Sequence, residues 1–147
     1  MTNKILKATL DKKFSKISDF NEVDKKIKKI ESLKVINLIM SYVNYRDDRS
    51  MLKYVSRNIA IWKMCLLIVE SYVSSKNISE KEIIDNIQCS AMTANTYIKE
   101  LVELGFIYLK ADILDKRKKN IFPSKDFINE MYKFIEYLQK KITELSL

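Results

Sequence analysis

The sequence predicts a mainly α-helical fold that contains one small β-hairpin. The 147 residues include one glycine and one proline, which leaves little material for the tight turns of an all-β fold. Apolar residues recur three and four positions apart over long stretches, as the buried face of a helix requires. This spacing gives way to strand-like alternation just after Gly105, and the hairpin is therefore expected there.

The N-terminal half is expected to form a basic extension followed by two long helices. The first 30 residues carry nine lysines against four acidic side chains, and residues 1–20 have weak periodicity. We expect residues 1–20 to form a basic arm or a short helix, and residues 21–147 to form a single domain. Helical spacing covers residues 23–45, and a second helix is expected at about residues 50–73. The later part of this second helix is apolar nearly all round, which places it in the core.

A helix-turn-helix is predicted in the middle of the chain. The segment "ISEKEIIDNIQCS" contains a short helix, with Ser79 as its expected N-cap and Glu82 completing a capping box. After the turn "QCS", Ser90 is the expected N-cap of a longer helix. That helix should end at Gly105, because glycine adopts the left-handed conformation that terminates helices. A short and a longer helix joined by a tight turn form this motif, whose second helix can enter a DNA major groove.

A β-hairpin is expected directly after the helix-turn-helix, as the wing of a winged helix. The strands "FIYLK" and "NIFP" flank the charged loop "ADILDKRKK", and Pro123 ends the second strand because it lacks a backbone donor. Ser124 is the expected cap of the last helix. The DNA-binding core then covers about residues 57–123. The flanking helices at residues 23–45 and 125–145 carry more apolar surface than one small core needs, which predicts dimerisation helices.

The composition favours an anionic partner and disfavours catalysis. The net charge of +8 results from 27 basic and 19 acidic residues. Only four of the basic residues are arginine, so the abundance of lysine is also consistent with an AT-rich genome. The chain has no histidine, no CxxC pair, no glycine-rich phosphate loop and no nucleophile elbow. We therefore expect no metal, no cofactor and no enzymatic activity.

The two cysteines and the apolar segments predict a cytosolic protein. Two cysteines without a signal peptide are typical of a reducing compartment. Cys65 is expected in the core; Cys89, in the turn of the helix-turn-helix, is expected to be a structural thiol, with a redox switch as the alternative. The most apolar stretch, "IAIWKMCLLIVESYV", is too short to span a bilayer, and no membrane association is expected.

The candidate DNA-binding residues lie on the second helix of the motif and in the wing loop. Asparagine can read adenine, threonine can contact a thymine methyl, and threonine and lysine can hold phosphates. An arginine at the wing tip suits a narrow minor groove, and Asp115 is expected to orient it through a bidentate pair. The alternative is that both surfaces are ordinary solvated faces. The candidates are Ser90, Met92, Thr93, Asn95, Thr96, Lys99, Lys116, Arg117, Lys118 and Lys119.

The segment "IKELVELGFIYL", followed by "DKRKKNIFPS" with its Asp115-x-Arg117 spacing, resembles the MarR-type winged-helix transcriptional regulators. In that family a leucine-rich helix end, a glycine, a strand and a D-x-R wing tip recur in this order. The resemblance covers about residues 58–145. It implies a homodimer whose terminal helices pack together, so that two winged helices straddle a roughly palindromic DNA site.

The expected function is a homodimeric, sequence-specific regulator of transcription that binds double-stranded DNA and acts as a repressor. Its recognition helix would enter the major groove and its wing the adjacent minor groove, in the bacterial or archaeal cytoplasm near the nucleoid. One alternative is a protein-interaction or assembly module with an incidental basic surface. Another is a DNA-binding factor of replication or partition. A small-molecule effector is possible, although no signal in the residues supports one.

Overall fold

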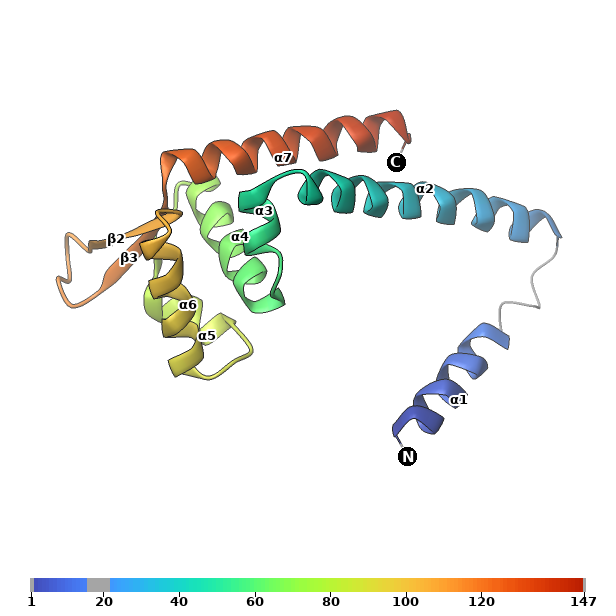
Figure 1. Cartoon of the computed structure of the whole chain (residues 1–147), viewed down its shortest axis with the longest axis horizontal. Helices are drawn as coiled ribbons and strands as arrows, with labels where there is room; N and C mark the ends of the chain where they lie inside the picture. The colour runs from blue at the N-terminus through green and yellow to red at the C-terminus, as the bar shows by residue number, and fades with distance from the viewer. Residues whose placement is uncertain (1, 16–21, 147) are drawn as a thin grey trace.

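The computed structural model describes residues 2–15 and 22–146 of the chain, and most of these residues are helical. The prediction of a mainly α-helical chain with a small β wing is confirmed. Figure 1 shows α2 and α7 side by side as a long arm, with the remaining domain elements gathered at one end of it. The elements in order are α1 (Thr2–Ser15), α2 (Glu22–Asp47), α3 (Ser50–Val55), α4 (Ile59–Val73), β1 (Ile78–Ser79), α5 (Glu80–Asn86), α6 (Ala91–Glu103), β2 (Ile107–Ala111), β3 (Lys119–Pro123) and α7 (Lys125–Glu144).

The helix expected over residues 50–73 is two helices, so this prediction was wrong in one respect. α3 ends at Val55, and α4 begins at Ile59 after a corner. The Asn58 side chain caps the start of α4, because its Oδ1 accepts the Ala60 N–H at 2.8 Å and the Ile61 N–H at 3.3 Å. An N-cap satisfies amide groups that a helix start leaves unpaired, and it therefore favours a new helix at this point.

The sheet has three antiparallel strands in the order β1-β3-β2, one more than the predicted hairpin. β2 and β3 pair along their whole length, from Ile107 opposite Pro123 to Ala111 opposite Lys119. The two-residue β1 adds to the other edge of β3, with Ile78 opposite Ile121. This third strand anchors the base of the wing to the start of the helix-turn-helix.

Gly105 ends α6 as predicted. Its φ of +74° lies in the left-handed region, which a residue without Cβ adopts at low cost. The Gly105 N–H donates to the Val102 carbonyl, and the Phe106 N–H donates to the Leu101 carbonyl, both at 3.0 Å. These two bonds form a Schellman motif, which satisfies the last carbonyls of the helix and turns the chain into β2.

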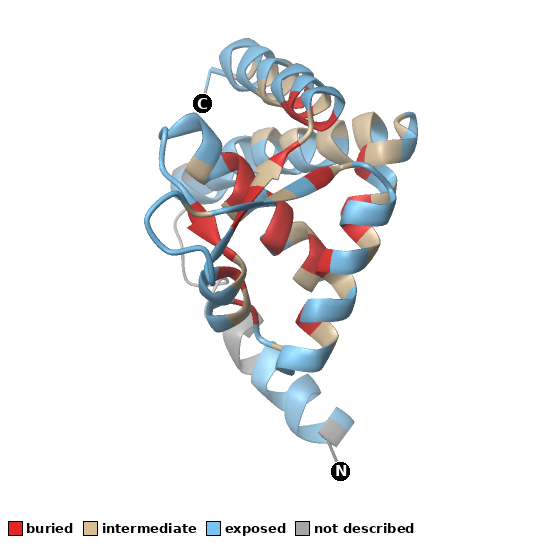
Figure 2. Ribbon diagram, turned by 90° about the vertical axis from the view of Figure 1, so that its left-hand side faces the viewer, coloured by how far each residue is buried: buried red, intermediate tan, exposed pale blue. Residues whose placement is uncertain are grey.

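The core lies between the sheet and the helices around it, where Figure 2 shows the buried residues gathered. Cys65 and Val69 of α4 are buried as expected, but Ile59 and Leu66 of the same helix are exposed. α4 is therefore not enclosed on all sides, contrary to the prediction from its composition. The largest fully buried side chains are Leu52, Val55, Ile61, Met64, Cys65, Ile68, Ile83, Ile98, Leu101, Phe127 and Met131.

The arm of α2 and α7 is held together by aromatic side chains near the domain. Tyr45 stacks on Tyr137 with ring centroids 4.4 Å apart, and Tyr42 contacts Phe134 at 5.6 Å. Further along α2, seven large apolar side chains are about half exposed, although α7 runs beside the helix. These residues are Ile27, Ile30, Leu33, Val35, Ile36, Ile39 and Met40.

Candidate nucleic-acid interface

The predicted recognition helix is α6, and its inner face is fixed to the core. Ala94, Ile98 and Leu101 are buried at helical spacing. Ser90 caps the helix as expected, since its Oγ accepts the Thr93 N–H at 3.1 Å. The Ser90 hydroxyl also donates to Thr93 Oγ1 at 2.8 Å, so these two candidate residues serve the start of the helix.

The outer face of α6 is exposed and carries no acidic residue from Ala91 to Lys99. Met92 is 80% exposed, and Asn95, Thr96 and Lys99 are exposed beside it. The Thr96 hydroxyl donates to the Met92 carbonyl at 3.0 Å, which leaves its methyl group and oxygen lone pairs for other contacts. Asn95 and Lys99 are thus the longer polar side chains that this face presents to solvent.

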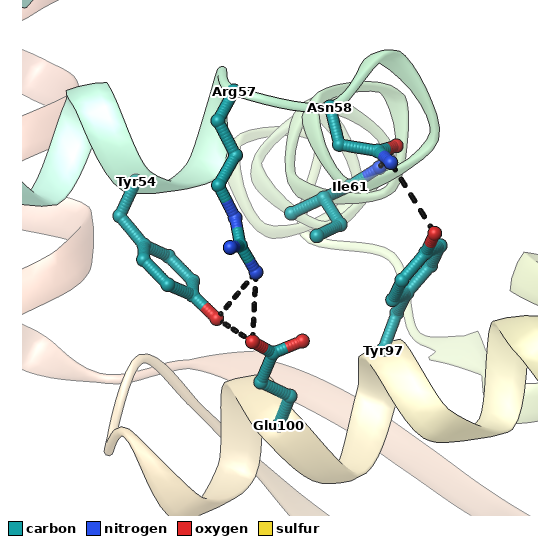
Figure 3. A network of polar contacts seen from close by, with 6 residues as sticks. All are labelled: Tyr54, Arg57, Asn58, Ile61, Tyr97 and Glu100. Carbon is teal, nitrogen blue, oxygen red and sulfur yellow. Dashed lines mark hydrogen bonds and ion pairs between the residues drawn. The ribbon is translucent and has the colours of Figure 1, made fainter.

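A polar network joins α6 to the corner between α3 and α4 (Figure 3). Arg57 Nη2 donates to Glu100 Oε1 at 2.8 Å and to the Tyr54 hydroxyl at 3.0 Å. The Tyr54 hydroxyl itself donates to Glu100 Oε1, and the Arg57 guanidinium lies 4.2 Å from the centre of the Tyr54 ring. Burial, and then the bond to Glu100, raise the pKa of Tyr54 above its ordinary value of 10.0, so the hydroxyl stays a donor at neutral pH.

One turn earlier on α6, the Tyr97 hydroxyl accepts the Asn58 Nδ2–H at 3.2 Å. Asn58 therefore caps α4 and contacts α6 with the same amide group. These contacts to α6 were not predicted from the sequence. The available signal was the placement of Tyr97 and Glu100 three residues apart on one flank of the helix, together with Arg57 among only four arginines.

Backbone hydrogen bonds fold the wing loop. The Asp112 N–H donates to the Lys118 carbonyl at 2.9 Å, and the Lys118 N–H donates to the Asp115 carbonyl at 3.0 Å. Asp115 Oδ1 accepts the backbone N–H of Arg117 at 3.0 Å. The expected bidentate pair is therefore replaced by an Asx turn, in which Asp115 orders the Arg117 backbone and leaves the guanidinium to other partners.

The wing and the helix-turn-helix line an open cleft of about 720 Å³. Asn95 of α6 lines it together with Arg117 and Lys119 of the wing, so the structure brings the two predicted groups together. The wall formed by α5 carries Glu82, which lies 3.6 Å from Lys118 Nζ. Of the remaining candidates, Lys118 also lines the cleft, as does Asp115, whereas Ser90, Met92, Thr93, Thr96, Lys99 and Lys116 do not.

The described residues also bear on a metal site, a reactive cysteine and a membrane-spanning helix. Across residues 2–15 and 22–146, no group of three or more His, Cys, Asp or Glu side chains is placed to hold a metal ion. Cys65 is fully buried, and burial raises the pKa of its thiol to about 12, whereas Cys89 is half-buried. Within the same part of the chain, no helix is long and apolar enough to cross a membrane.

Comparison with known proteins identifies the fold by structure and not by sequence. No protein-family model and no curated relative matches the sequence. MepR of S. aureus bound to ethidium bromide is 14% identical and has a TM-score of 0.59, over 88% of this chain and 83% of that chain. MepR in a DNA-binding conformation is 16% identical, with a TM-score of 0.51 over 76% and 80%.

A third similar structure is the heme sensor PefR of Streptococcus agalactiae in complex with heme and carbon monoxide. It is 18% identical, with a TM-score of 0.51 over 85% of this chain and 79% of that chain. Identities this low establish the shared architecture alone. The chain therefore has the winged-helix fold of the MarR-like regulators.

Proposed function

We propose that the protein is a MarR-type regulator of transcription that binds double-stranded DNA sequence-specifically as a homodimer and acts as a repressor. One observation carries this proposal: the exposed face of α6, which carries no acidic residue from Ala91 to Lys99, shares a cleft with the basic wing. The MepR structure in a DNA-binding conformation has the same fold. This role places the protein in the cytoplasm, at the nucleoid of a bacterium or archaeon.

The chemistry of the two surfaces suits the two grooves of one DNA duplex. On α6, Asn95 can pair with an adenine edge, the Thr96 methyl can contact a thymine, and Lys99 can reach a phosphate. On the wing, Arg117 suits the negative potential of a narrow minor groove. Lys116, whose side chain is exposed beside it, adds charge for the flanking phosphates.

The apolar stripe on α2 supports the homodimer. Leu33, Ile36, Ile39 and Met40 are about half exposed on a helix that packs against α7 and α3 of the same chain. Soluble monomers rarely leave such a continuous apolar stripe in water, because each exposed aliphatic side chain forgoes hydrophobic stabilisation. A second copy of the chain would cover this stripe by packing arm against arm.

DNA binding is tested with duplexes selected from the native genome by the purified protein. We expect the affinity for a selected duplex to fall steeply with salt concentration, since each lysine or arginine on a phosphate releases counterions. Arg117→Ala should weaken binding by about 1–3 kcal/mol. The control is Lys76→Ala, which removes one positive charge from the turn between α4 and β1 and should leave affinity nearly unchanged. Equal affinities for Arg117→Ala and the parent protein on every selected duplex would remove the wing from the interface.

The dimer is tested by sedimentation velocity. Ile36→Glu places a charge on the apolar stripe and should produce monomers at concentrations where the parent protein sediments as a dimer. Ser41→Glu adds the same charge about 140° around the helix from Ile36 and is the matched control. A parent protein that sediments as a monomer at every concentration would refute the dimer.

A further inference from the structure

Two aliphatic side chains at the tip of the wing stand almost wholly in water. Ile113 is 92% exposed and Leu114 is 95% exposed. The next most exposed large apolar residues in the described part of the chain are Ile59 at 81% and Met92 at 80%. Single exposed apolar residues are ordinary, but two adjacent ones at the outermost part of a loop form a small apolar point.

The hydrogen bonds of the wing hold this point in place. Ile113 and Leu114 lie between Asp112, whose N–H is bonded to the Lys118 carbonyl, and the Asp115 turn. The Asp112 carboxylate also lies 3.5 Å from the Asn120 amide at the base of the loop. Both flanks of the pair are therefore fixed, so the two side chains project from an ordered loop (Figure 1 shows the extended hairpin).

The surroundings of the point restrict the partner. Asp115 follows Leu114, and four consecutive cations, Lys116 to Lys119, come next. Three of these cations, Arg117, Lys118 and Lys119, line the cleft shared with Asn95 of α6. The partner must therefore present closely spaced negative charges around an apolar interior that a branched side chain can enter. A DNA duplex offers this combination, with phosphates on both sides of a groove and stacked bases at its floor.

We propose that Ile113 and Leu114 act as an apolar wedge, which enters the minor groove and partly unstacks one base step when the wing binds. The preferred step is pyrimidine–purine, TA or CA, because these steps unstack and kink most easily. Lys116 and Arg117 would neutralise the phosphates that flank the opened step. The wedge rests on the proposed DNA binding. It adds indirect readout of the DNA sequence, because base steps that deform easily would be preferred.

The test uses a duplex selected from the genome, in which 2-aminopurine replaces adenine at one pyrimidine–purine step at a time. The parent protein should increase the fluorescence at a step in the outer part of each half-site, since an unstacked 2-aminopurine is less quenched. The double variant Ile113→Ser/Leu114→Ser should abolish this increase and lower the affinity by about tenfold or more. Because both side chains are exposed, its thermal unfolding should match that of the parent. The control is Val73→Ser, which removes an exposed aliphatic side chain from the end of α4.

The outcomes separate this proposal from the function on which it rests. If the parent binds the duplex without a fluorescence change at any step, or the double variant binds and unstacks it equally well, the wedge is wrong and DNA binding stands. If the parent binds no duplex, both proposals are wrong. If the parent instead binds phosphatidylserine vesicles and the double variant does not, the apolar point serves a lipid surface and the wedge is refuted.

Discussion

The network that joins Tyr54, Arg57 and Glu100 predicts a measurable coupling between the corner after α3 and α6. The perturbations are Tyr54→Phe, which removes the hydroxyl alone, and Glu100→Gln, which keeps the shape and removes the charge. In a double-mutant cycle, the two changes should not be additive, because Glu100 accepts the Tyr54 hydroxyl hydrogen directly.

The expected magnitude follows from exposure and geometry. The Arg57 and Glu100 side chains are 49% and 36% exposed, so water screens their 2.8 Å ion pair to about 0.2–1 kcal/mol. The hydrogen bond from the Tyr54 hydroxyl to the Glu100 carboxylate is charge-assisted but partly exposed. It should therefore contribute about 1.5 kcal/mol to stability, which is the low end for such bonds. We expect each single change to cost about 1 kcal/mol, with a coupling energy of about 0.5–1 kcal/mol.

Urea unfolding followed by far-UV circular dichroism measures these free energies, at one protein concentration and with an unchanged m-value. Glu103→Gln, which removes an exposed charge from the same helix, is the control and should stay within about 0.5 kcal/mol of the parent. Strictly additive single changes, or an equal loss from Glu103→Gln, would refute the network as an energetic link.

The pH dependence supplies an independent check of the same network. The folded-state pKa of Tyr54 is raised, so the stabilisation linked to its proton is fully present below its ordinary pKa of 10.0. It is lost as pH rises through the folded-state pKa. The stability difference between the parent and Tyr54→Phe should therefore be constant around neutral pH and shrink only above pH 10.

Three further predictions concern the fold. Gly105→Ala should cost about 1–2 kcal/mol from the positive φ alone, because an added Cβ would meet no atom within 4 Å; a larger loss in urea unfolding would contradict this account. Ile68→Ala should cost about 2–5 kcal/mol by the same measurement, since the side chain is fully buried, and a loss below 1 kcal/mol would mean that the core is looser than described. In native protein, iodoacetamide should modify Cys89 and spare Cys65, whose thiol has a pKa raised to about 12 by burial; mass spectrometry of the peptides would show the reverse if the core opened readily.

Features that depend on neighbouring residues were predictable from the sequence. Ser79, Ser90 and Ser124 were assigned as helix caps, and each accepts the N–H three residues ahead. The end of α6 at Gly105 was predicted for the same reason, because a left-handed turn depends on the residue that occupies it. Cap and turn chemistry acts over three or four positions, and the residue types alone reveal it.

Features that depend on distant contacts were missed or misassigned. β1 is two residues long and exists because Ile78 meets Ile121, more than forty positions away in the sequence. The apolar pattern continues across the corner before Asn58, so the break between α3 and α4 was hidden from a periodicity analysis. Asp115 was expected to hold the guanidinium of Arg117, yet the wing loop directs its carboxylate to the Arg117 backbone.

The order of the elements, their caps and the basic wing follow from the sequence by itself, because propensity, capping and charge belong to each residue and its near neighbours. Only the tertiary structure decided how α6 is connected, through Glu100 and Tyr97, to the corner that contains Arg57 and Asn58. It also decided which apolar side chains remain uncovered on α2 and at the wing tip. Both outcomes depend on which surfaces meet when the chain packs. Such contacts join residues that are far apart in the sequence, so local sequence patterns do not reveal them.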